Sequence, residues 1–206
     1  MRYCPADASC VARSRAAALV LGLALVACGC VDVEGDLAAD GSLSLRYTYT
    51  PPRHATFKSE RARLTSPHVR VEDLQRDQSL DGYSPREFVT ATLAVDDARQ
   101  IATAEAFSAV GVTLDLAKGE LRLTFPGMDP KLRERFRTAA EGMNRAVRLS
   151  LVLPGPVKGA EPAATIDGRR VTWNFSLREF AALGDTVTLT ASWTAAAVPP
   201  QPRPVT

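Results

Sequence analysis

The sequence has little of what builds disulfide frameworks and metal sites. None of its four cysteines lies beyond residue 30, and it contains only two histidines, His54 and His68. No disulfide can therefore link two parts of the chain beyond that point. A zinc site of the usual Cys/His kind is excluded as well, because no cysteine follows either histidine. The folded part must be held together by its hydrophobic core.

The sequence also lacks the short motifs of familiar enzyme mechanisms. It contains no Gly-x-Ser-x-Gly, no phosphate-binding glycine loop, no dinucleotide fingerprint and no His-Glu-x-x-His. The carboxylates Asp32, Glu34, Asp36 and Asp40 have no twelve-residue calcium-loop pattern, and the Asp96-Asp97 pair suits a helix cap. We therefore expect no catalytic residues, no metal, no cofactor and no enzymatic activity.

A short apolar run, residues 16–27, follows Arg13 and Arg15 and ends at Cys28. Twelve helical residues rise only about 18 Å, whereas the hydrocarbon core of a bilayer is about 30 Å thick. The run is therefore too short to span a membrane. It is apolar on all sides, whereas a core helix alternates its faces, so the pattern favours the h-region of a signal peptide.

The tetrad Leu25-Val26-Ala27-Cys28 resembles the lipobox of bacterial lipoproteins. The resemblance implies that residues 1–27 are a lipoprotein signal peptide and that Cys28 is lipidated with a diacylglyceryl group, becoming the acylated N-terminus. Two acyl chains, of the palmitate kind, suffice for stable attachment. The protein would then lie in the cell envelope, lipid-anchored to a bacterial membrane on the extracytoplasmic side.

Three alternatives remain open around this segment. Cys30 is a rival lipidation site, but the residues before it fit a lipobox less well than those before Cys28. Translation starts at Met1 or at Val11, because the segment from Val11 to Arg15 already makes a conventional n-region. Gly29 permits delivery to the outer membrane without requiring it, which leaves inner and outer membrane both open.

The charge balance gives no support for a polyanionic partner. Removal of residues 1–27 takes away three of 25 basic and one of 23 acidic side chains, which leaves 22 of each. Nucleic-acid binding needs a concentrated basic surface, so we expect none. The remaining length suits one domain, residues 28–194, followed by a proline-rich disordered tail, residues 195–206.

Apolar and polar residues alternate with period two over most of this domain, which is typical of half-buried strands. The predicted strands are 31–37, 43–49, 68–73, 87–95, 112–116, 121–125, 147–153, 171–175 and 187–193, with turns at Asp40-Gly41 and Asp167-Gly168. We predict helices over 53–65, after the Asp96-Asp97 cap with Ile101, Ala104 and Phe107 inward, from Pro130, and over 177–183. Residues 74–85 read as a polar loop. Outward positions are Thr186, Thr188, Thr190, Ser192, Arg148, Ser150, Arg122 and Thr124.

This pattern predicts an α+β fold: a single domain in which helices pack on one face of an antiparallel sheet of hairpins. The early Val-x-Val-x-Gly-x-Leu strand, the segment from Leu149 to Val157 with its Leu-Pro-Gly turn, and the segment from Asp167 to Trp173 together resemble the LppM-type domain of bacterial lipoproteins. The resemblance would cover most of residues 28–194. That family has no established catalytic residues, so the resemblance implies none here.

Three further features have a structural and a binding interpretation. Pro154-Gly155 indicates a turn in which glycine accepts a positive φ. Trp173 and Trp193 are expected in the core, although they could line a lipid groove. Lys131, Arg133, Arg135 and Arg137 could hold lipid headgroups, but the nearby Glu134 and Glu141 favour a solvated helix face.

We therefore expect a non-catalytic, membrane-anchored envelope lipoprotein that binds a lipid or an envelope partner. The alternative is a structural or assembly lipoprotein that docks a partner protein through its surface or its tail. The identity of the ligand-binding residues stays open on the sequence alone.

Overall fold

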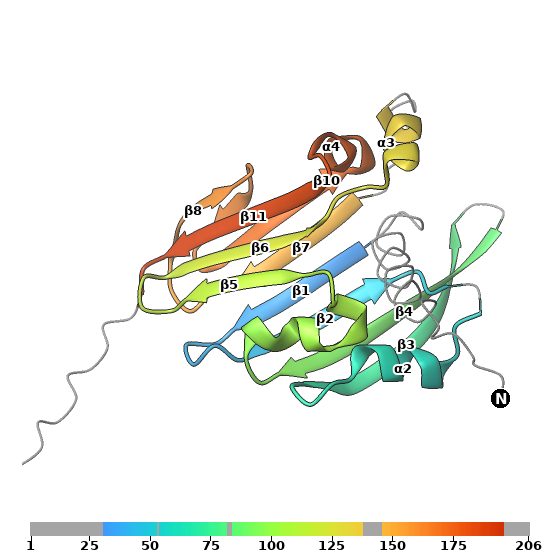
Figure 1. Cartoon of the computed structure of the whole chain (residues 1–206), viewed down its shortest axis with the longest axis horizontal. Coiled ribbons are helices and arrows are strands. Elements are labelled where there is room, and N and C mark those ends of the chain that lie inside the picture. Colours follow the sequence, from blue (N-terminus) through green and yellow to red (C-terminus); the bar gives the residue numbers. More distant parts are fainter. Residues whose placement is uncertain (1–30, 53, 82–83, 138–145, 196–206) are drawn as a thin grey trace, which may run out of the picture.

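The computed structural model describes residues 31–52, 54–81, 84–137 and 146–195 (Figure 1). Cys28, Cys30, the signal segment and the proline-rich tail lie outside these residues, so their predicted roles remain predictions. The strands are β1 (Val31–Leu37), β2 (Leu43–Tyr49), β3 (Val69–Asp81), β4 (Ser84–Val95), β5 (Gly111–Asp115), β6 (Glu120–Pro126), β7 (Ala146–Val152), β8 (Val157–Glu161), β9 (Thr165–Asp167), β10 (Arg170–Ser176) and β11 (Thr186–Trp193). The helical segments are α2 (Phe57–Leu64), the 3-10 helices η1 (Ala98–Thr103) and η2 (Glu105–Phe107), α3 (Pro130–Arg137) and α4 (Leu177–Ala182).

The strands form two sheets. The larger has seven strands in the order β3-β4-β2-β1-β7-β10-β9, and the smaller has four in the order β5-β6-β11-β8. The pair β1 and β7 is parallel, with Val31 opposite Val147, whereas β1 and β2 run antiparallel. Figure 1 shows β5, β6 and β11 lying over the part of the larger sheet that contains β1 and β7.

The predicted α+β arrangement is therefore wrong. The chain is mostly strand, one strand pair is parallel, and the few short helices form no layer over a sheet face. Alternation with period two shows that one face of a strand is buried, but it does not say whether helices or a second sheet cover that face. Here the covering layer is the second sheet.

The predicted polar loop at 74–85 is also wrong. Most of it belongs to β3 and β4, which pair in antiparallel register from Val69 opposite Val95 to Asp81 opposite Ser84. β3 is an edge strand, and charged residues are common on edge strands because they discourage pairing with another chain. The part of β3 after residue 73 was predicted as a loop because most of its residues are polar. The short strands β8 and β9 were missed as well.

The buried side chains form two clusters. One fills the space between the sheets in the region of β10 and β11 and contains both tryptophans, each 1% exposed. The other lies on the β2, β3 and β4 part of the larger sheet and includes Leu64 of α2 together with Ile101, Ala104 and Phe107. The prediction that these last three residues point inward is confirmed, although Ile101 and Phe107 lie on 3-10 helices and Ala104 lies between the two.

Two kinds of local signal, at the turns and at a helix end, act as expected, and a third, at Gly155, does not. Gly41 and Gly168 adopt φ of 90° and 58° in the two predicted turns, a region that glycine enters without steric cost. Asp97 accepts a hydrogen bond from the Arg99 amide at 2.9 Å and so caps η1. Gly155 does not have a positive φ. A Cβ there would lie 2.1 Å from the Thr194 carbonyl oxygen, so glycine is needed because the Thr194 backbone passes too close for any side chain.

Candidate apolar ligand site

An apolar cavity of about 140 Å³ lies between the two sheets. Strands β1, β2 and β7 form one wall, and β5, β6, η1 and η2 form the other. The first wall includes Val31, Val33, Leu45, Tyr47, Leu149 and Leu151, and the second includes Phe107, Val110, Val112, Leu121, Leu123 and Phe125. Apolar cavities of roughly this size can stay dry and take apolar ligands; one of about 150 Å³ binds benzene.

The residues that line the cavity differ in burial. Val31, Leu37, Leu121 and Leu151 are at most 5% exposed, whereas Val147, Phe125 and Val110 are partly buried. Val147 pairs with Val31 at the start of β1, so the cavity reaches the end of the sheets where β1 and β7 begin.

Aromatic contacts place Phe125 at this same end. Its ring stacks on that of Phe180, with centroids 6.3 Å apart, and Phe180 belongs to α4 directly after β10. The last residue of β10, Ser176, pairs with Ala146 at the start of β7. This end of the cavity is therefore framed by the starts of β1, β5 and β7 and by the end of β6.

The interior of the cavity carries almost no charge. The charged residue in its lining is Arg148, but its neighbours Val147 and Leu149 occupy the inward positions of β7. The Arg148 guanidinium binds Asp32 and Glu34, with Nη1 to oxygen distances of 3.3 and 3.1 Å. Asp32 and Glu34 belong to the carboxylate group that was considered above as a calcium site, and both are paired with Arg148 instead. The lining therefore suits hydrocarbon and disfavours a charged headgroup.

Two stacked tyrosines support one wall. The ring centroids of Tyr47 and Tyr49 lie 4.5 Å apart, with an interplanar angle of 16°. The Tyr47 ring also packs against that of Phe107, with centroids 5.5 Å apart. Burial raises the pKa of both hydroxyls far above their ordinary value, and the hydrogen bond from Tyr49 to Glu60 raises that of Tyr49 further. Both hydroxyls stay neutral at physiological pH.

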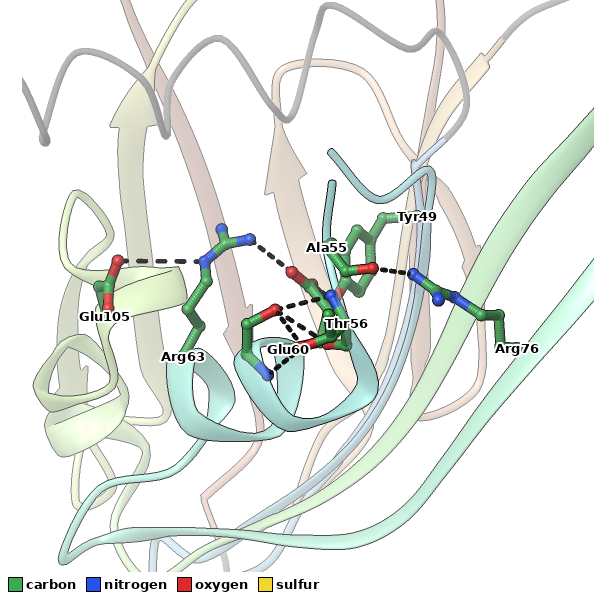
Figure 2. A network of polar contacts seen from close by, with 8 residues as sticks. Tyr49, Ala55, Thr56, Glu60, Arg63, Arg76 and Glu105 are labelled. Carbon is green, nitrogen blue, oxygen red and sulfur yellow. Dashed lines mark hydrogen bonds and ion pairs between the residues drawn. The ribbon is translucent and has the colours of Figure 1, made fainter. Parts of the chain in front are cut away.

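A buried polar network fixes this wall to the helical segments beside it (Figure 2). The Tyr49 hydroxyl donates to Glu60, which is 2% exposed, and Arg63 pairs with Glu60 at 2.9 Å. Arg63 also reaches Glu105 of η2 at 4.0 Å. The network thus links β2, α2 and η2, and η2 contributes Phe107 to the cavity. Sequence reasoning missed Glu60, because a glutamate on a short polar helix gives no sign of burial.

Several predicted positions turn out to be structural. Trp173 and Trp193 are buried in the core, as predicted, and do not line the cavity. In α3, Arg133 donates to the Met128 carbonyl at 3.0 Å and pairs with Asp185, so it ties α3 to the segment before β11. Lys131 is exposed, and the side chains of Arg135 and Arg137 lie outside the described residues.

The predicted outward set is largely confirmed. Thr186, Thr188 and Arg122 are exposed on the smaller sheet, and Arg122, Thr190 and Ser192 line a shallow groove of about 640 Å³ there. Ser150 is the exception: it is fully buried and lies within 3.0 Å of both the Thr172 hydroxyl and the Arg170 guanidinium. Flanking long side chains cover this short one.

Two observations concern the described residues as a whole. No group of three or more His, Cys, Asp or Glu side chains comes together there in a way that could hold a metal ion. None of the helices in this part of the chain combines the length and apolar character needed to cross a bilayer.

The comparisons with known proteins find similarity among solved structures. No family model matches the chain, and no curated protein matches it significantly. Among solved structures, the folded domain of LppM from Mycobacterium tuberculosis, determined by NMR, is similar with a TM-score of 0.40 and 14% identity, over 81% of this chain and 92% of that one. Values this low do not establish membership of that family.

Proposed function

We propose that this protein is a lipid-anchored envelope lipoprotein that binds an acyl chain of a membrane lipid in the cavity between its two sheets. One observation carries the proposal: the cavity is apolar throughout and reaches the start of β1, where Val31 lines it. Val31, the first residue of β1, follows Cys28 by three residues. An anchor at Cys28 would hold this end of the cavity close to the bilayer surface.

The energetics favour a hydrocarbon ligand. A cavity of about 140 Å³ accepts about six carbon atoms, by comparison with the benzene-binding cavity. At about 0.8 kcal/mol for each buried methylene, this burial is worth roughly 5 kcal/mol before the cost of ordering the chain. Such a gain supports reversible binding of part of one chain. The proposal needs no catalytic residue.

The test uses the full-length lipoprotein in vesicles of phosphatidylethanolamine and phosphatidylglycerol, with a trace of phosphatidylglycerol that carries a diazirine near the end of one acyl chain. Irradiation is followed by peptide mapping with mass spectrometry. We expect label on the peptides of β5 and β6, and a loss of at least fivefold in Val112→Phe, which places a ring in the cavity. Val152→Phe is the matched control, because Val152 lies on the opposite face of β7 and does not line the cavity.

Label confined to exposed residues, or equal label on the cavity peptides of both variants, would contradict the proposal. Folding of each variant is checked by its circular dichroism and its urea unfolding midpoint before the label is compared.

A further inference from the structure

We infer that the cavity holds one acyl chain of the protein's own anchor, the lipid on Cys28. This inference rests on the proposed function and names the ligand of the same site. An envelope lipid would then enter the cavity only by displacing the anchor chain.

The first step is the distance from the anchor to the site. Two residues, Gly29 and Cys30, separate Cys28 from Val31, which itself lines the cavity. A fully extended chain covers at most about 3.6 Å for each of the three steps, so the Cα of Cys28 can lie no farther than roughly 11 Å from the Cα of Val31. Strand β1, which begins at Val31, fixes this end of the tether beside the cavity.

The second step is the length and the number of acyl chains. The two leaflets of a bilayer share a hydrocarbon core of about 30 Å, so one acyl chain reaches about 15 Å. This reach exceeds the tether, and the end of the chain can therefore enter the cavity. A volume of about 140 Å³ holds part of one chain and excludes a second. One chain of a diacylglyceryl group would be inside and the other would remain in the bilayer.

The third step is the competition between the tethered chain and free lipids. A ligand on a short flexible tether has an effective concentration in the millimolar range. The lining selects for hydrocarbon and does not distinguish one saturated chain from another, because Arg148 is engaged by Asp32 and Glu34. With equal intrinsic affinity, the tethered chain has the advantage over any free lipid that is present at the cavity below the millimolar range.

The test places the photoreactive group on the anchor alone. The full-length protein is produced in bacteria fed a diazirine-bearing fatty acid, so that the lipid on Cys28 carries the label. The protein is purified, transferred to vesicles of ordinary phospholipid, irradiated and mapped by mass spectrometry. We expect crosslinks from Cys28 to the peptides of β1, β5 or β6, reduced at least fivefold in Val112→Phe and unchanged in Val152→Phe.

Two controls identify the source of the chain. The Cys28→Ser variant from the same culture has no covalent lipid, and equal label on its cavity peptides would show that a free lipid is the occupant. Protein grown in heavy nitrogen without diazirine is added to the vesicles, and label on these heavy chains would show insertion from a neighbouring molecule. Either result overturns the inference and leaves the proposed function standing.

Crosslinks to phospholipid alone would also overturn the inference, because they place both anchor chains in the bilayer. The vesicle experiment with labelled phosphatidylglycerol then decides the proposed function separately. If Val112→Phe fails to fold, Val33→Phe replaces it, because Val33 lies on the opposite wall of the same cavity.

Discussion

The two halves of the space between the sheets differ in how well they are filled. Around β10 and β11, Trp173 and Trp193 occupy inward positions, and neither lines the cavity. Around β1, β2 and β5, the inward positions hold valine, leucine and tyrosine, and a cavity of about 140 Å³ remains. Both halves have the same alternating pattern. The size of the inward side chains, rather than the pattern, separates a packed core from a core with a cavity.

The largest expected effect lies in the filled half. Trp173→Ala should lower the free energy of unfolding by about 3–5 kcal/mol, because the deletion leaves a large cavity in a fully buried site. Trp173→Phe should cost much less, since Nε1 of Trp173 has no hydrogen-bond partner among the described residues and the substitution removes a buried, unpaired donor. Urea unfolding measures both. Equal losses for the two variants would show that the indole nitrogen has an important partner.

The next effect lies beside the cavity. Glu60→Ala should cost about 2–3 kcal/mol, because it leaves the buried Tyr49 hydroxyl and the partly buried Arg63 guanidinium without their common acceptor. Glu60→Gln keeps an acceptor of similar shape and should lose roughly half as much. The unfolding free energy of the two variants, measured in urea, checks the order. A neutral Glu60→Ala would mean that the network contributes nothing to stability.

A matched pair of substitutions compares the two halves directly. Val187→Phe enlarges a residue that is 1% exposed in the filled half and should cost about 1–3 kcal/mol through overpacking. Val112→Phe extends into the cavity and should change stability by less than about 1 kcal/mol while blocking the lipid label. Thermal unfolding of the two variants in the same buffer provides the comparison. Equal destabilisation would argue against a space in the second half that can accept a ring.

The smallest effect is a pH dependence in the filled half. The Ser176 backbone amide donates to Glu179 at 2.7 Å, and this bond holds the pKa of Glu179 below its ordinary value. The stabilisation of α4 is therefore complete above that ordinary value and is lost as the pH falls through the lower folded pKa. Amide exchange at Phe180 and Ala181 should show this loss in wild type, after correction for intrinsic rates, and not in Glu179→Gln. Identical profiles in the two proteins would contradict it.

The sequence predicts most of the strands because their alternation is local, and it predicts the turns at Asp40-Gly41 and Asp167-Gly168 because their chemistry is local. It does not predict the second sheet, because the partner of a strand such as β6 depends on β11, far along the chain. The second part of the polar edge strand β3, after residue 73, was missed for a related reason: pairing with β4 makes it a strand, whereas its own residues resemble a loop.

The candidate site was even less predictable. Its lining residues were recognised as inward positions, but a cavity arises only where inward side chains from two sheets fail to meet, and that depends on the spacing of the sheets. Glu60 gave no signal, because its burial follows from the docking of α2 against β2 and η2. The predicted lipidation at Cys28 lies outside the described residues and remains a prediction.

The parallel pairing of β1 with β7 has a consequence for the synthesis and folding of this protein. Asp32 and its partner Arg148 are 116 positions apart. At a synthesis rate of about 5–20 residues per second, roughly 6–23 seconds pass before the second member of the pair exists. During that time β1 can join β2 but offers its other side to any passing strand, which is a recognised route to aggregation. Chaperone binding would matter most in this interval, and slower translation between β2 and β7 should lower the yield of folded protein.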